Sequence, residues 1–275
     1  MPMKREVTNV IRTILDEWVP PVIRDSRLFM WPFFCLAYRF HNIREVMQFK
    51  DRVCNFTEEE YEDFYANLNS LSRHRQTDLT ERSIEAILRE CEGASQVLDA
   101  GCSAGYLLKR MHQHNPALTL SGCDVLPSVE EDGFSYRKNN LIHLDYADNA
   151  FDTVTCCHTL EHVLDLRQCV AELRRVTARK LIIVVPRQRY YFYTLDEHIH
   201  FFPSKEQLLL QMGFQANRHG IEAITHHEPF LYAQIIGGQY IRAPQLKQEK
   251  HFCCPAADAS DINQAFHDVI IIPFS

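Results

Sequence analysis

Asp99, Gly101 and Gly105 follow an apolar run at Val97 and Leu98, and this order of residue types can form a ligand site. The pattern indicates a buried strand that ends on an acid and turns through glycines into a helix. Glycine lets the backbone come close to a ligand because it has no side chain. A carboxylate at Asp99 would repel a pyrophosphate seated on the next helix N-terminus, so the turn disfavours a dinucleotide.

The glycine spacing also differs from that of dinucleotide-binding folds, which use Gly-x-Gly-x-x-Gly. This chain has Asp99-x-Gly101-x-x-x-Gly105. A ligand that carries an ammonium, a sulfonium and an adenosine but no phosphate suits an acid beside such a turn, and we therefore predict S-adenosylmethionine. Asp124 ends the next expected strand, where a carboxylate can accept both ribose hydroxyls. A loop-capping acid is the alternative interpretation of Asp124.

His158 follows the fourth expected strand at its carboxyl end, where ligands bind in open parallel sheets. It can act as a general base near a transferred group, or it can line the pocket without moving a proton. With Glu161 and His162 it falls at i, i+3 and i+4, which is one face of a helix turn, and a helix is expected over 161–176. Adding His198 and His200 would complete a metal site. Because histidines also cap helices and pack in cores, we expect no metal here.

The composition bounds the function. A chain of 275 residues with 46% hydrophobic and 24% charged residues predicts one large domain, or one domain with an appendage. The net charge of -7 with dispersed Lys and Arg argues against nucleic acid as a partner. Ten cysteines without a Cys-x-x-Cys spacing, and no pattern of a signal peptide, predict free thiols in the cytoplasm.

Strand and helix patterns alternate after residue 78 and predict a doubly wound α/β sheet. The expected strands are 96–99, 118–124, 134–138, 152–157, 181–185, 214–221 and 268–272. Residues 1–78 contain no glycine and carry helical signals, so we predict a helical N-terminal segment that caps the substrate. Residues 79–275 form the ligand-binding domain, with a late insert around 222–265.

The apolar run from Leu28 to Tyr38 is far shorter than the roughly 20 residues that cross a bilayer. We expect it to pack as core or as a lid over the pocket. Peripheral membrane contact through residues 28–38 is the alternative, and it would make a cytoplasmic protein membrane-associated.

The runs 97–105 and 144–163, with Asp124 between them, resemble class I S-adenosylmethionine-dependent methyltransferases of the small-molecule, type 11-like subgroup. The resemblance covers roughly residues 80–215. It implies a Rossmann-like sheet of seven strands, mixed in direction, with a helical N-terminal extension. Carried over by position, it implies these cofactor-binding residues: Asp99, Gly101, Ser103, Gly105, Asp124, Val125, Asn140, Leu141 and His158. Asn140 stands where aspartate is usual, and its amide oxygen can still accept from the adenine amine.

The resemblance implies methyl transfer from S-adenosylmethionine, with His158 as the catalytic residue. We expect the acceptor to be a hydroxyl, in preference to an amine or a carbon, of a small molecule, sugar or lipid-linked precursor. One alternative is a metal-dependent RNA 2'-O-methyltransferase, whose Glu-x-x-Glu-His this chain matches except for His158 at the first glutamate. Others are a catalytically silent binding subunit and a nicotinamide reductase, which the turn at Asp99 disfavours.

Overall fold

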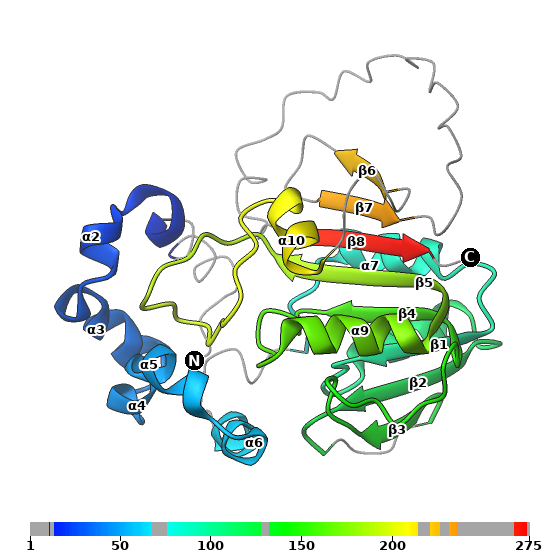
Figure 1. Ribbon diagram of the computed structural model, residues 1–275, viewed down its shortest axis with the longest axis horizontal. Coiled ribbons are helices and arrows are strands. Elements are labelled where there is room, and N and C mark those ends of the chain that lie inside the picture. Colours follow the sequence, from blue (N-terminus) through cyan, green and yellow to red (C-terminus); the bar gives the residue numbers. More distant parts are fainter. Residues whose placement is uncertain are drawn as a thin grey trace.

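The computed structural model (Figure 1) describes residues 11, 14–67, 76–127 and 132–213, together with the backbone of three later strands. Helices of residues 14–67 lie beside the sheet, and the chain that follows residue 186 runs between the two. The expected strand 214–221 and most of the insert 222–265 lie outside the described residues.

The sheet has five consecutive parallel strands in the order β3-β2-β1-β4-β5. Their bounds are β1 Gln96–Ala100, β2 Thr119–Asp124, β3 Ser135–Lys138, β4 Phe151–Cys157 and β5 Thr177–Pro186. Three strands described by backbone alone extend it: β8 His267–Pro273, antiparallel to β5, then β7 Leu231–Ile235 and β6 Ile221–Thr225. The predicted count of seven strands is therefore wrong, because the region expected to be an insert supplies strands to the sheet.

Helices cover both faces of the sheet. Their bounds are α7 Glu81–Glu90, α8 Tyr106–His114, α9 Leu166–Val176 and α10 Lys205–Gln211. Successive strand residues point to opposite faces, so Val97 packs with α7 and α8 while Leu98 packs with α9 and α10. On β5, Ile182 likewise packs on the side of α7 and α8, and Ile183 on the side of α9 and α10. This two-sided burial confirms the doubly wound arrangement and explains why β5 has a continuous apolar sequence.

Short helices occupy the N-terminal region: η1 Ile14–Trp18, α2 Pro21–Arg24, α3 Arg27–Ala37, α4 Ile43–Met47, α5 Phe49–Arg52, η2 Val53–Asn55 and α6 Glu58–Asn67. Thr57 and Glu60 form the capping box expected from the sequence. Glu60 N donates to Thr57 Oγ1 at 3.2 Å and Thr57 N donates to Glu60 Oε2 at 2.9 Å. This reciprocal pair fixes the start of α6, which covers the site described below.

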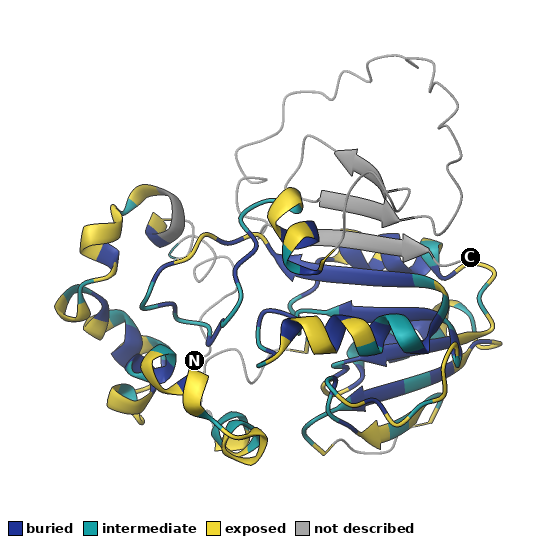
Figure 2. Cartoon of the chain, in the orientation of Figure 1, coloured by how far each residue is buried: buried dark blue, intermediate teal, exposed yellow. Residues whose placement is uncertain are grey.

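The apolar run 28–38 forms α3 and divides between core and surface. Met30 and Phe34 are buried in a cluster that includes Tyr191 from the chain after β5. Leu28 is 86% exposed and Trp31 51%, so only part of the run is core as expected (Figure 2). None of the helices in the described ranges has the length and apolar character that a membrane span requires.

Candidate cofactor and acceptor site

Gly101 sits at the turn that leaves β1. Its φ is +81°, which favours glycine, and its N–H donates to the carbonyl of Cys123 at 2.8 Å. A Cβ at this position would meet the side chain of Thr159, lying 2.6 Å from its Cγ2. The turn after β4 therefore rests directly on the backbone of Gly101, and only glycine leaves room for it.

Asp124 ends β2 beside this turn, as expected. Its Oδ2 accepts from the Ser103 N–H at 2.9 Å and its Oδ1 accepts from the Leu126 N–H at 3.1 Å. Burial raises the pKa of this carboxyl group, while the backbone hydrogen bonds lower it. Asp124 thus holds Ser103 in its left-handed conformation and places a carboxylate on the wall of a cavity.

Asp99 lies beneath the turn and does not line the cavity. Its side chain is buried, and Thr155 Oγ1 donates a 2.7 Å hydrogen bond to its Oδ1. Burial raises the pKa of Asp99 from 3.8 to about 7, against the lowering effect of Thr155. Gly105, at the N-cap of α8, also lies outside the cavity lining, with Phe134 packed over it. Cofactor contact by Asp99 and Gly105 stays a prediction.

The shifted pKa of Asp99 predicts a pH-dependent stability. Between pH 4 and 7 the folded chain holds a proton that the unfolded chain has lost, so stability falls as pH rises. Asp99→Asn has no carboxyl group at this position and should not show this fall in stability. The difference in free energy of unfolding, variant minus wild type, should therefore rise by about 2 kcal/mol between pH 5 and pH 8. Urea denaturation at both pH values measures the difference.

Asp152→Asn is the control for this pH dependence. Amides of Ser95 and Gln96 lower the pKa of Asp152, so its contribution to stability is complete above pH 5 and its substitution should cost the same at both pH values. A pH-independent difference between Asp99→Asn and wild type would contradict the prediction.

Asn140 and Leu141 follow β3 and both line the cavity. Asn140 Oδ1 accepts from the Ile142 N–H at 3.2 Å, and its Nδ2 donates to Glu58 Oε2 on α6 at 3.1 Å. The amide oxygen expected to accept from adenine therefore has one lone pair in use and one remaining. Glu58 brings a carboxylate to the same wall, which the sequence did not predict.

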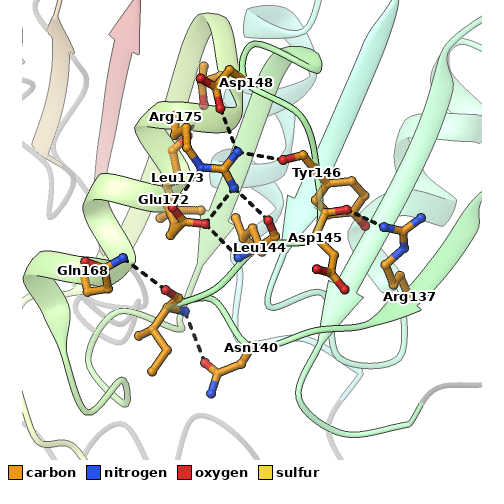
Figure 3. Close-up of polar contacts among 12 residues, drawn as sticks. Arg137, Asn140, Leu144, Asp145, Tyr146, Asp148, Gln168, Glu172, Leu173 and Arg175 are labelled. Carbon is orange, nitrogen blue, oxygen red and sulfur yellow. Dashed lines mark hydrogen bonds and ion pairs between the residues drawn. The ribbon is translucent and has the colours of Figure 1, made fainter.

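Arg175 on α9 anchors the loop that carries these residues (Figure 3). Its guanidinium donates to the carbonyls of Leu144 and Tyr146, both at 2.7 Å, and to the carboxylates of Asp148 and Glu172. Glu172 in turn accepts from the Leu144 N–H at 2.8 Å. One side chain thus donates to two carbonyls and two carboxylates and joins the loop to α9.

Arg175→Met should lower the free energy of unfolding by about 2 kcal/mol, because it leaves loop carbonyls and Glu172 without their charged donor. Chemical denaturation monitored by circular dichroism measures the loss. Arg167→Met on the exposed side of the same helix is the matched control and should change stability by less than about 0.5 kcal/mol. Equal losses for the two variants would count against the anchoring role.

The residues from His158 to Asp165 form turns, so the helix expected over 161–176 is wrong at its start. The helix α9 begins at Leu166, after an Asp165 side chain that accepts from the Gln168 N–H at 3.0 Å. His158 has a φ of +54° and donates its N–H to the Val184 carbonyl. It lines the cavity, and its Nδ1 lies 3.4 Å from Glu161 Oε1.

The cavity lies at the carboxyl ends of β1, β2 and β4. It brings together all the predicted cofactor residues except Asp99 and Gly105: Gly101, Ser103, Asp124, Val125, Asn140, Leu141 and His158. The sequence did not predict the remaining lining residues, namely Glu58, Tyr61, Tyr65, Leu126, Ile142, Thr159, His162, Val163 and Leu164. Three of these belong to α6, so the N-terminal region contributes directly to the site.

Two tyrosines of α6 form hydrogen bonds to the turn after β4 and to the chain after β5. Tyr61 OH donates to the His162 carbonyl, and Tyr65 OH donates to the Glu197 carbonyl at 3.0 Å. Tyr65 Oη also lies 2.8 Å from His162 Nδ1. Burial raises the pKa of both tyrosines well above 10, so both keep their phenolic protons at neutral pH.

Residues 98–185, which hold the glycine turn, Asp124 and the 158–165 turns, match the family model described as "Methyltransferase domain". This region is similar to methyltransferase domains. Class I methyltransferases use S-adenosylmethionine, the ligand predicted from the acid and the glycine turn. Residues 98–185 carry all nine proposed cofactor residues, and seven of them line one cavity.

The chain is also similar to individual proteins. It is 31% identical over 149 residues to an uncharacterized protein of Methanocaldococcus jannaschii, covering 52% of this chain and 61% of that relative. The YcgJ protein of Bacillus subtilis is 19% identical, with a TM-score of 0.42, over 53% of this chain and 71% of that one. A SAM-dependent methyltransferase of Aquifex aeolicus is 17% identical, with a TM-score of 0.41, over 63% and 93%.

Proposed function

We propose that the chain transfers the methyl group of S-adenosylmethionine to a hydroxyl of a small molecule, sugar or lipid-linked precursor. The observation that carries the proposal is the shared cavity of Gly101, Asp124, Asn140 and His158. It combines a ribose-binding carboxylate, a close backbone approach and a candidate base at the carboxyl ends of parallel strands.

The donor set fits this cofactor. Asp124 presents a carboxylate, which suits ribose hydroxyls, and no phosphate has to be seated beside it. The apolar side chains of Val125, Leu126 and Leu141 offer walls for a flat adenine ring. Asn140 and Glu58 supply oxygen acceptors for the adenine amine next to those walls.

S-adenosylmethionine supplies a methyl carbon that is already activated, so the chain mainly has to orient the acceptor and exclude water. Helix α6 supports the second task, since Tyr61 and Tyr65 hold it over the turn that carries His158. We assign to His158 the role of accepting the proton of the acceptor hydroxyl as that oxygen attacks the methyl carbon. The carboxylate of Glu161, 3.4 Å from His158 Nδ1, would stabilise the resulting imidazolium.

A metal-dependent RNA 2'-O-methyltransferase is a second candidate because Glu161, His162 and His198 cluster beside the cavity. The net charge of -7 opposes it, since RNA binding draws on excess positive charge. The role of residues 1–78 in choosing the acceptor stays a prediction, as does membrane contact through residues 28–38.

Calorimetry with S-adenosylmethionine tests the cofactor, and reduced nicotinamide dinucleotide serves as the counter-ligand. We expect one molecule of S-adenosylmethionine to bind per chain and the dinucleotide not to bind. Incubation with methyl-labelled cofactor and separate small-molecule, lipid and RNA fractions of a cell extract tests the acceptor. Label in RNA would favour the second candidate, and binding without transfer to any fraction would favour a silent binding subunit. Absence of binding would overturn the proposal.

A further inference from the structure

Glu161, His162 and His198 bring one carboxylate and two imidazoles together, with candidate ligand atoms within 4.8 Å of one another. Glu161 is 1% exposed, and no described residue donates a hydrogen bond to either of its carboxylate oxygens. Burying a carboxylate in this way costs several kcal/mol unless a positive charge compensates it. A metal ion held by this cluster would compensate the buried carboxylate, next to the imidazole of His158, whose Nδ1 lies 3.4 Å from Glu161 Oε1.

The backbone brings the three residues together independently of any ion. The carbonyl of Glu161 accepts from the Ile199 N–H at 2.7 Å and from the His200 N–H at 3.0 Å. These bonds tie the chain after β5 to the turn after β4 and set His198 beside Glu161. His200 itself points elsewhere, since its Nε2 lies 2.9 Å from the Val163 carbonyl.

In both imidazoles, Nδ1 has a hydrogen-bond partner. Gln188 Oε1 can only accept, so His198 Nδ1, 2.6 Å away, carries a proton. Tyr65 OH donates to the Glu197 carbonyl, so its oxygen accepts from His162 Nδ1 at 2.8 Å. Protonation at Nδ1 leaves the lone pair on Nε2 of each ring. An outer hydrogen bond at the second ring nitrogen is the usual setting of a metal-bound histidine.

We propose that Glu161, His162 and His198 bind one first-row transition-metal dication of the Zn²⁺ or Co²⁺ type. Two neutral imidazoles with one carboxylate suit such ions better than Mg²⁺, which prefers oxygen ligands. The set differs from the sequence-based expectation of no metal. It also omits His158, which the 158–165 turns place on the cavity wall.

The ion would lie at the border of the cavity, because His162 belongs both to the cluster and to the cavity lining. Three protein ligands leave coordination positions open for an oxygen of the acceptor. This role in acceptor binding rests on the proposed function, whereas binding of the ion itself does not.

Metal binding is tested on the full chain after treatment with a chelator. We expect about one equivalent of Co²⁺ to bind, with visible absorption bands, and Zn²⁺ to displace it. Glu161→Gln and His198→Asn should each weaken Co²⁺ binding by at least about tenfold. His200→Asn is the matched control, a neighbouring histidine outside the cluster, and should bind Co²⁺ as wild type does.

Three outcomes would overturn the metal site: no Co²⁺ or Zn²⁺ bound to wild type, equal binding in the Glu161 and His198 variants, or tighter binding of Mg²⁺ than of Co²⁺. Calorimetry with S-adenosylhomocysteine on the same variants shows that they are folded. The same measurement separates the two proposals. Metal binding without binding of S-adenosylhomocysteine would refute methyl transfer and leave the metal site standing.

Discussion

Replacing Asp124 with alanine is expected to weaken binding of S-adenosylhomocysteine about 100-fold. A hydrogen bond to a charged group contributes about 1.5–3 kcal/mol, and two ribose hydroxyls can reach this carboxylate. A loss of about 3 kcal/mol corresponds to about two factors of ten in affinity. The variant also releases the Ser103 N–H, which shapes the wall of the cavity. Isothermal calorimetry measures the change.

Two further variants isolate the role of Asp124. Asp124→Asn keeps an oxygen for the Ser103 N–H but loses the charge, so we expect an intermediate loss of about tenfold. Asp148→Ala removes an exposed carboxylate on the loop after β3 and should leave affinity nearly unchanged. Affinity of Asp124→Ala within threefold of wild type would refute ribose binding by this residue.

Gly101→Ala is expected to lower the free energy of unfolding by about 3 kcal/mol and to abolish detectable cofactor binding. A left-handed conformation costs a residue with a Cβ about 1–2 kcal/mol. The new Cβ would also lie 2.6 Å from Thr159 Cγ2, and overpacking adds about 1–3 kcal/mol. Relief of the clash requires the turn after β4 to move off the glycine turn, which opens the cavity.

Gly93→Ala provides the matched control for the backbone cost. Gly93 has a φ of +76° and no atom within 4 Å of the place that a Cβ would occupy, so its substitution carries strain without a clash. We expect the Gly101 variant to lose at least 1 kcal/mol more than the Gly93 variant. Adding Thr159→Gly to Gly101→Ala removes the clash, so the double variant should recover this extra loss of unfolding free energy. Equal losses for the Gly101 and Gly93 variants would refute the close approach of Thr159 to Gly101.

Local sequence signals predicted the parts of the fold that depend on neighbouring residues. The apolar run before Asp99 and the glycines after it identified β1 and the turn, and Thr57 with Glu60 identified the start of α6. Asp124 was placed from its position at the end of a strand. Each of these features is set within a few residues, which is the range over which backbone preferences and caps act.

The 158–165 turns were missed because a spacing of three and four residues suits a helix and a compact turn equally well. Asp165, with Gln168 three residues later, was the available signal for a later start of α9. The sequence predicted an N-terminal cap, but not that Tyr61 and Tyr65 hold it, because these contacts join segments about a hundred residues apart. No periodicity in the sequence reports which distant elements meet.

The two tyrosines of α6 have a thermodynamic consequence. A molecule bound in the cavity touches α6 on one side and the ends of the strands on the other, so it is held by two distant parts of the chain. If α6 separates from the strands, the bound molecule loses contacts. Its binding therefore raises the free energy of this local opening. Occupancy of the cavity should therefore oppose local separation of α6 from the ends of the strands.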